Sequence, residues 1–188
     1  MVDLKGLHKQ FILEHLDEGE VAADLTMGNG GDTAFLSKTV GERGRVYAFD
    51  IQELAIESTK KRLLEEDCPD NTVLICDSHH KAKEYIKEPI KAGMFNLGYL
   101  PGSGAKHITT MRKTTMAAVE AAIELLLPDG VLIVAIYPGH EEGELEGEML
   151  REYFKTLSRF KICASEFRIL NSPTSPYFFL LEKSEKCL

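Results

Sequence analysis

The sequence lacks long apolar runs, paired cysteines and an excess of basic residues. No hydrophobic run approaches the roughly 20 residues of a transmembrane helix, and the N-terminal segment MVDLKGLHKQ has no signal-peptide hydrophobic region. The four cysteines are scattered without a C-x-x-C pair, which predicts a cytoplasmic protein with reduced thiols and no metal site. With 22 Lys+Arg against 30 Asp+Glu, the net charge of −8 argues against a broad, non-specific nucleic-acid-binding surface.

The composition is that of a globular protein. The 188 residues are 44% hydrophobic and 28% charged, which excludes a disordered chain, a collagen-like chain and a disulfide scaffold. This length suits one domain with a sizeable core. We therefore expect a single domain over residues 1–188, in which residues 1–17 form an N-terminal helical extension around an amphipathic helix at Leu4–Leu16.

Short apolar runs alternate with segments of helical spacing. The runs are rich in β-branched residues and mostly lack a polar face, as in strands of a parallel sheet that is buried on both sides. They lie at Val21–Thr26, Arg45–Asp50, Thr72–Asp77, Met94–Leu100 and Val131–Tyr137. Helices are expected around Leu54–Leu64, from Met111 to a stop at Pro128-Asp129-Gly130, and from about Glu142 to Leu157.

The last two strand-like runs, Ile162–Leu170 and Tyr177–Lys183, are separated by only six residues. Because a parallel crossover needs a dozen residues or more, these two runs should pair antiparallel. The pattern as a whole predicts an α/β fold. We expect a Rossmann-like, doubly wound, seven-stranded sheet, mostly parallel with an antiparallel C-terminal strand and with helices on both faces.

A glycine-rich turn follows the first predicted strand, where open α/β sheets bind ligands. Its segment DLTMGNGGDT has Gly28 and Gly30, but Thr33 stands where a dinucleotide fingerprint would have its third glycine. Asp24 and Asp32 flank the turn. Two carboxylates would repel a pyrophosphate but favour a sulfonium or an ammonium, so the turn favours S-adenosylmethionine (SAM) over NAD.

The ends of the other parallel strands carry further polar side chains. Asp50 ends the second run and suits the ribose hydroxyls of either nucleotide, while Asp77 ends the third and could meet an adenine amino group. The fourth leads into NLGYLPG, in which Asn96 offers a carbonyl acceptor beside an aromatic residue. The fifth leads into YPGH, so an aromatic residue and an imidazole should converge on the same edge.

The chain resembles the class I SAM-dependent methyltransferases and, within them, the bacterial rRNA methylase-like family, whose members are associated with methylation of the 5-aminomethyl group of wobble uridine in tRNA. The resemblance spans nearly the whole chain. It is carried by DLTMGNGGDTAFL (24–36), YAFDIQ (47–52), DSHH (77–80), FNLGYLPG (95–102) and YPGHEEGELE (137–146). The chain departs from the family at Gly31, where a polar residue is usual, and in the run from Ser103 to Lys106.

The resemblance implies a set of site residues. Those expected to bind the cofactor, besides Asp24, are Thr26, Met27, Gly28, Asn29, Gly30, Asp32 and Thr33 at the methionine moiety, Asp50 at the ribose, Ile51 and Gln52 near the adenine, and Asp77, Ser78 and His79 on the adenine or sulfonium side. Those expected to shape the acceptor pocket and act in catalysis are Asn96, Tyr99, Tyr137 and His140, with His140 or His79 helping to remove a proton. It also implies an RNA substrate, for which a tRNA anticodon stem-loop is favoured, no membrane partner, and a homodimer as one possible assembly.

Other readings stay open at the level of the sequence. A class I methyltransferase acting on rRNA or on a small molecule fits the same motifs, and the negative net charge favours the small molecule. Short basic clusters at 81–91, 106–113 and 151–161 could instead flank a pocket that holds RNA. An NAD-dependent oxidoreductase or a SAM-binding regulator without activity are further alternatives. The four acids around the predicted cofactor account for part of the net charge, so that charge excludes a broad basic groove but permits a small RNA footprint.

Overall fold

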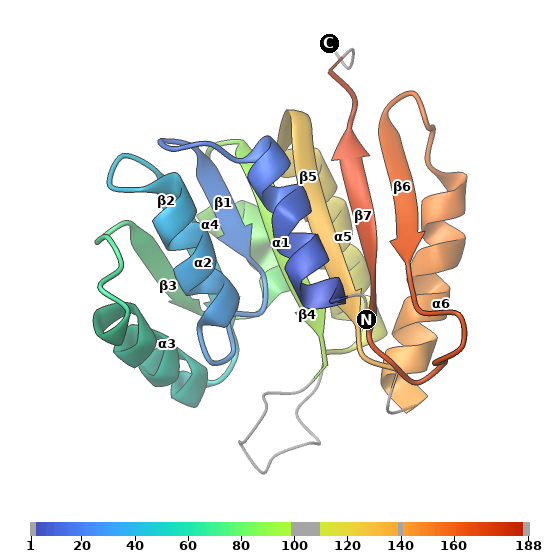
Figure 1. Ribbon diagram of the computed structural model, residues 1–188, viewed down its shortest axis with the longest axis horizontal. Helices are drawn as coiled ribbons and strands as arrows, with labels where there is room; N and C mark the ends of the chain where they lie inside the picture. Colours follow the sequence, from blue (N-terminus) through green and yellow to red (C-terminus); the bar gives the residue numbers. More distant parts are fainter. Residues whose placement is uncertain (1–2, 99–109, 139–140, 186–188) are drawn as a thin grey trace.

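The computed structural model describes residues 3–98, 110–138 and 141–185, in which strands and helices alternate (Figure 1). The helices are α1 (Leu4–His15), α2 (Gly31–Val40), α3 (Glu53–Glu65), the 3-10 helix η1 (His79–Lys81), α4 (Ala82–Tyr85), α5 (Arg112–Leu125) and α6 (Glu141–Thr156). The strands are β1 (Val21–Asp24), β2 (Arg45–Asp50), β3 (Thr72–Cys76), β4 (Ile90–Leu97), β5 (Leu126–Ile136), β6 (Ile162–Phe167) and β7 (Tyr177–Lys183). None of the described helices is long and apolar enough to cross a membrane.

All seven strands form one sheet in the order β3-β2-β1-β4-β5-β7-β6. The first five are parallel to one another, and β7 runs antiparallel to both β5 and β6. The predicted fold class is therefore confirmed, including the antiparallel pairing of the last two strands. The chain moves outward from β1 to β3 and then returns to β4, so the strand order reverses between β1 and β4. In sheets of this kind ligands bind at the carboxyl ends of the strands beside such a reversal.

Helices cover both faces of the sheet and bury a core on each (Figure 1). Ile12 of α1 and Leu36 of α2 pack against one face, whereas Ala118 of α5 and Leu150 of α6 pack against the other. The strands between them are almost entirely buried, because both of their faces meet a helix. The edge strand β6 differs: its residues alternate between less and more buried, as expected for a strand with one solvated face.

The structure corrects the expected boundary between α5 and β5. We expected Pro128-Asp129-Gly130 to end the helix, but α5 already ends at Leu125 and β5 begins at Leu126. The strand accommodates the Pro-Asp-Gly sequence through an irregularity: Asp129 has a positive φ of 57°, and the pairing with β4 shifts register between Ile90 and Ala92. A bulge of this kind tolerates a proline that a regular ladder would not.

Candidate active site

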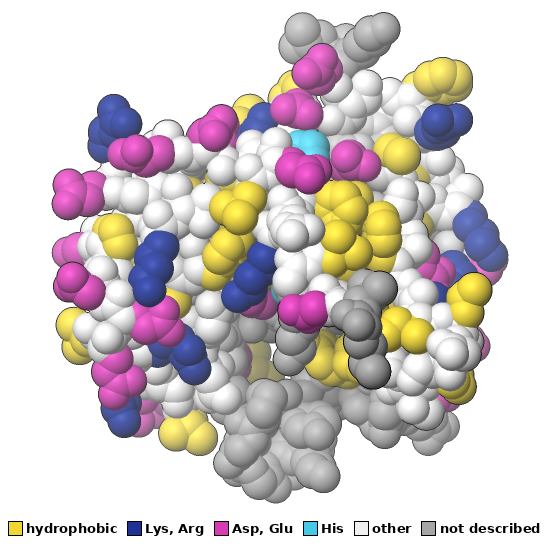
Figure 2. All heavy atoms as spheres, in the orientation of Figure 1, with side chains coloured by type: hydrophobic (Ala, Val, Ile, Leu, Met, Phe, Trp, Pro, Cys, Tyr) yellow, Lys and Arg dark blue, Asp and Glu magenta, His cyan; other side chains and the backbone are white. Residues whose placement is uncertain are grey.

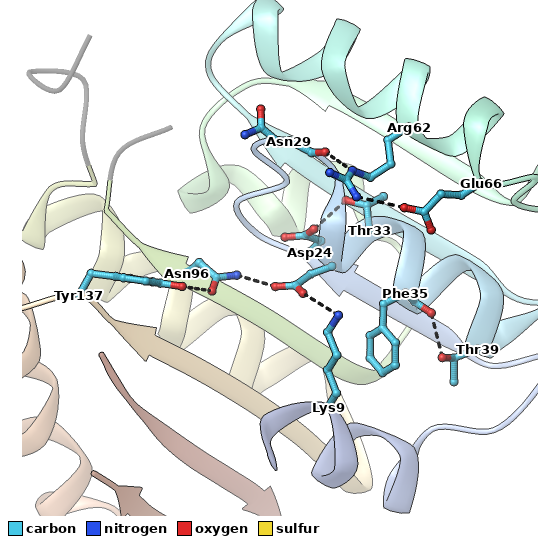
Figure 3. A network of polar contacts seen from close by, with 11 residues as sticks. Lys9, Asp24, Asn29, Thr33, Phe35, Thr39, Arg62, Glu66, Asn96 and Tyr137 are labelled. Carbon is cyan, nitrogen blue, oxygen red and sulfur yellow. Dashed lines mark hydrogen bonds and ion pairs between the residues drawn. The ribbon is translucent and has the colours of Figure 1, made fainter. Parts of the chain in front are cut away.

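The carboxyl ends of β1, β2, β4 and β5 bring polar side chains together next to the glycine-rich turn (Figure 3). Residues 24 to 33 leave β1 and enter α2, Asp50 ends β2, and Asn96 is the next-to-last residue of β4. Tyr137 directly follows β5. The parallel pairing aligns these positions: Asp24 lies opposite Met94 on β4, and Asn96 lies opposite Ala135 on β5.

The glycine-rich turn is held in shape by β2 and α3. Gly28 and Gly30 have positive φ values of 51° and 76°, which favour glycine. The backbone N–H of Gly28 donates to Asp50 Oδ2 at 3.1 Å, and Thr59 Oγ1 donates to the Gly28 carbonyl at 3.3 Å. A Cβ on Gly30 would lie 2.9 Å from the Cα of Thr59. The turn is therefore preorganised, with α2 starting immediately after it.

The turn is fixed by a contact from α3 at its tip and by the burial of one of its own side chains. Arg62 Nε donates to the carbonyl of Asn29 at 2.7 Å, so α3 also fixes the exposed tip of the turn. Met27 is 3% exposed and packs with Ala48 and Ala55. Because its side chain lies in this small core, Met27 can present only its main chain to a ligand.

Asp24 is fully buried beneath the turn. It accepts hydrogen bonds from Thr33 Oγ1 at 2.6 Å and from the backbone N–H of Thr26 at 3.1 Å. Burial, and next the negative charge of Asp32, raise the pKa of the Asp24 carboxyl from 3.8 to about 7. Thr26 extends this contact to the next strand, because its Oγ1 accepts the backbone N–H of Asn96 at 2.8 Å.

Asp32 connects the turn to the side chains of β4 and α1. Its Oδ2 accepts a hydrogen bond from Asn96 Nδ2 at 2.8 Å, and Lys9 Nζ lies 3.8 Å from its Oδ1. On the far side of Asn96, the Tyr137 hydroxyl donates to Oδ1 at 3.4 Å. Burial raises the pKa of Tyr137, so its hydroxyl is neutral and keeps its proton at physiological pH.

Asp50, Ile51 and Gln52 form the edge of the site at the end of β2. The two oxygens of Asp50 accept the backbone N–H groups of Gly28 and Gln52, at 3.1 and 3.0 Å. Desolvation raises the pKa of this carboxyl. Ile51 is 55% exposed, which leaves an apolar side chain uncovered beside the carboxylate. A carboxylate with free lone pairs next to an apolar surface can accept hydroxyl groups and support a flat ring.

The segment after β3 contains a carboxylate with several hydrogen-bond partners and a buried imidazole, of which one nitrogen has none among the described residues. Asp77 accepts hydrogen bonds from Tyr85 Oη (2.7 Å), Lys81 Nζ (3.0 Å) and the Ser78 backbone (2.7 Å), which lower its pKa to about 2. His79 is buried, and its ring lies edge-on to Phe95 with 4.8 Å between ring centres. Burial lowers the pKa of His79 to about 4, so the imidazole is neutral at pH 7.

Nε2 of His79 has no hydrogen-bond partner within the described part of the chain. An unpaired polar atom in a buried position is unfavourable, and a ligand that offers a hydrogen bond would remove the penalty.

The structure places most of the predicted site residues at one edge of the sheet. Tyr99 and His140 lie outside the described residues. Sequence reasoning missed Lys9, Thr59 and Arg62, whose positions depend on how α1 and α3 pack and carry no motif.

The model of the family described as "Putative rRNA methylase" matches residues 46–183. The chain belongs to this family. A chloroplastic tRNA (mnm(5)s(2)U34)-methyltransferase of Arabidopsis thaliana is 36% identical to it over 183 residues, which cover 90% of this chain and 65% of that protein. The chain therefore spans slightly less than two thirds of the length of that relative.

Solved structures agree with this membership in the rRNA methylase family. A "putative rRNA-methylase" from Clostridium thermocellum is 40% identical, with a TM-score of 0.93 and coverage of 97% of this chain and 98% of that one. A "putative methyltransferase" from Streptococcus mutans in complex with SAH is 34% identical, with a TM-score of 0.87 and coverage of 97% and 99%. The comparisons confirm the predicted family and fold, and they support the predicted enzyme class of SAM-dependent methyltransferase with SAM as its cofactor.

Proposed function

We propose that this protein methylates RNA, and that its target is the 5-aminomethyl group of wobble uridine in tRNA. The observation that carries the proposal is the Asn96 side chain, whose amide nitrogen donates to Asp32 and whose carbonyl oxygen lies beside the Tyr137 hydroxyl. A carbonyl oxygen in this place can accept an N–H of an amine and leave the lone pair of that amine free. The Arabidopsis relative, whose name specifies U34 of tRNA, supports the same target.

The residues around the turn fit SAM. The negative charges of Asp32 and Asp50 suit a ligand that carries a sulfonium and an ammonium, and Asp24 supports the turn from beneath through Thr33 and Thr26. The unpartnered Nε2 of His79 can take one hydrogen bond from such a ligand. We assign Asp50 to the ribose and Ile51 and Gln52 to the adenine. The groups assigned to the methionine moiety are the main chain from Met27 to Gly30 and the side chains of Thr26 and Thr33. Ser78 and His79 border the adenine or sulfonium side, together with Asp77.

The chemistry requires little from the protein beyond positioning. When bound, SAM supplies an activated methyl group on a sulfonium, which a nucleophile displaces in line. The amine must be neutral when it attacks, because an ammonium has no lone pair. Asn96 and Tyr137 would orient this amine, and the buried side chains beneath them would exclude water. With a pKa of about 4, His79 would be a weak proton acceptor, so His140 is the better candidate among the predicted residues.

The surface is compatible with a small RNA footprint. On the face shown in Figure 2, the acidic and basic side chains of the described residues are interspersed, and the basic ones are not gathered into one patch. Several phosphate contacts would make RNA affinity fall steeply with salt, whereas binding of an uncharged small molecule would change little. A single anticodon stem-loop would make only a few phosphate contacts, so we expect a measurable but modest salt dependence of tRNA binding.

Nucleoside mass spectrometry of total tRNA from a strain that lacks the gene tests this proposal. We expect unmethylated 5-aminomethyluridine to accumulate, and the wild-type gene to restore the methylated nucleoside. Complementation with Asn96→Ala should fail. Complementation with the control variant Asp70→Asn, which changes an exposed residue in the loop before β3, should succeed. An unchanged tRNA profile in the deletion strain would contradict the tRNA assignment. In that case a change in the rRNA nucleosides, or none in any RNA, would point to rRNA or to a small molecule.

A cytoplasmic location and a homodimer belong to the same proposal. The substrate tRNA would be met in the cytoplasm. Light scattering of the purified protein tests the assembly, for which a mass near 42 kDa would indicate a dimer of the 21.0 kDa chain.

A further inference from the structure

Lys9, Asp32 and Asn96 form a chain of contacts that begins on α1 and ends at the acceptor side of the site. Figure 3 labels the two ends of this chain, Lys9 and Asn96. Asp32 uses one oxygen for each neighbour: Oδ2 accepts from Asn96 Nδ2 at 2.8 Å, and Oδ1 lies 3.8 Å from Lys9 Nζ. Its side chain is only 20% exposed. One oxygen of Asp32 is thus hydrogen-bonded to Asn96, and the other lies within ion-pair distance of Lys9.

The carboxylate determines which way the amide of Asn96 faces. An ionised carboxylate can only accept hydrogen bonds, so the NH₂ group of Asn96 must face Asp32. The carbonyl oxygen then faces the opposite way, toward the Tyr137 hydroxyl, which can donate to it. If Asp32 were neutral or absent, the amide could rotate and present NH₂ to the pocket. That group would donate to the lone pair of an incoming amine and block its attack.

Lys9 supports this arrangement with a positive charge. Asp32 lies close enough to the buried Asp24 for its charge to raise the pKa of Asp24, so the two carboxylates repel each other. The ammonium of Lys9 offsets this repulsion from the solvent side. Its position is fixed by α1, whose Ile12 is fully buried against the sheet, and by the ring of Phe35, with 4.8 Å from Nζ to the ring centre.

We propose that Asp32, held by Lys9, is a positioning residue that fixes the Asn96 amide with its oxygen toward the methyl acceptor. This inference rests on the proposed function, in which the acceptor is an amine. It gives Asp32 a different role from the expected one beside the ammonium of the cofactor. It also makes α1 a part of the site, although α1 contributes nothing to the glycine-rich turn.

The test uses the full-length protein with the variants Asp32→Asn, Lys9→Met and Lys9→Arg. Lys38→Met is the matched control, because Lys38 forms a comparable ion pair with Glu66 away from the site. Asp32→Asn should lower kcat for tRNA by about tenfold to a hundredfold, since a misplaced acceptor loses its attack geometry. Lys9→Met should lower kcat by up to about fivefold, the effect of a partly exposed ion pair, and Lys9→Arg should restore it.

Affinity for SAH, measured by calorimetry, separates the two roles of Asp32. We expect the Kd of Asp32→Asn to stay within about threefold of wild type, because the cofactor does not depend on the Asn96 amide. A Kd that rises by about tenfold or more while kcat is unchanged would overturn the proposal and return Asp32 to the cofactor. Equal kcat values in all variants would overturn it as well.

A readout without turnover keeps this inference separate from the proposed function. In the cofactor-free protein, the side-chain NH₂ signals of Asn96 in a ¹⁵N correlation spectrum, identified by their loss in Asn96→Ala, should be shifted and protected from exchange in wild type. Both properties should be lost in Asp32→Asn and weakened in Lys9→Met. Signals that are the same in all variants would refute the arrangement. A wild-type protein that methylates no tRNA but shows these changes would refute only the proposed substrate.

Discussion

The buried carboxyl of Asp24 predicts an unusual dependence of stability on pH. Its pKa is raised from 3.8 to about 7, chiefly by burial. Between these two values the folded protein keeps a proton on Asp24 that the unfolded chain has released. The folded state therefore binds more protons in this window, and the free energy of unfolding falls as the pH rises from about 4 through 7. Each pH unit corresponds to about 1.4 kcal/mol, so the full loss is about 4 kcal/mol.

Asp24→Asn removes this term while it keeps the shape of the side chain. An amide can still accept from the backbone of Thr26, and it can donate to Thr33 Oγ1. We expect the variant and the wild type to have similar free energies of unfolding at pH 5. About two pH units separate pH 5 from the raised pKa of Asp24, so at pH 8 the variant should be more stable than the wild type by about 3 kcal/mol, because the wild type then holds a buried negative charge beside Asp32.

Urea denaturation at pH 5, 6, 7 and 8 measures the effect, with linear extrapolation to water at each pH. Asp70→Asn, which removes an exposed carboxylate on the loop before β3, is the control for the loss of one charge. Its profile should run parallel to that of the wild type. If Asp24→Asn also ran parallel to the wild type over this range, the reasoning from burial and from the neighbouring charge would be refuted.

Three further substitutions test packing and backbone geometry in different parts of the protein. Gly147→Ala should destabilise the protein by about 1–3 kcal/mol in urea denaturation, because the new Cβ would lie 2.1 Å from the Tyr177 hydroxyl, and Tyr177→Phe should recover part of the loss. Asn71→Ala should lower the melting temperature through a loss of about 2–3 kcal/mol, since the buried side chain satisfies two carbonyls at the end of α2. Gly30→Ala, at φ +76°, should weaken SAH binding in calorimetry because of the clash with Thr59.

Much of the fold could be predicted from local patterns. Strands buried on both faces read as apolar runs, and the six residues before Tyr177 are too few for a parallel crossover. The boundary of β5 was predicted wrongly because a Pro-Asp-Gly sequence normally marks a turn, whereas here the neighbouring strand β4 shifts register and keeps it in the sheet. The early part of β4 was also missed, since Lys91, Ala92 and Gly93 carry a weak strand signal.

The candidate site was predictable in position but not in orientation. The rule that ligands bind at the carboxyl ends of strands located Asp24, Asp50 and Asn96 from sequence alone. It could not show that Asp24 is fully buried against Thr33, nor that Asp32 faces Asn96. Lys9 was missed for a related reason: its contact with Asp32 depends on the path of α1 across the sheet, which leaves no trace in the spacing of residues.

The reversal of strand order between β1 and β4 also has a consequence for how the protein is made. The hydrogen bond between Asn96 and Asp32 joins positions 64 residues apart, and the one between Asn96 and Tyr137 joins positions 41 apart. During synthesis the glycine-rich turn, β2 and β3 leave the ribosome before β4 can insert beside β1. The nascent chain therefore forms the part of the candidate site around the glycine-rich turn and β2 first, and it adds Asn96 and Tyr137 only after β5 has been translated. Long-range parallel pairing of this kind is slow, so the late docking of β4 and β5 is the step at which the apolar edge of β1 is open to aggregation.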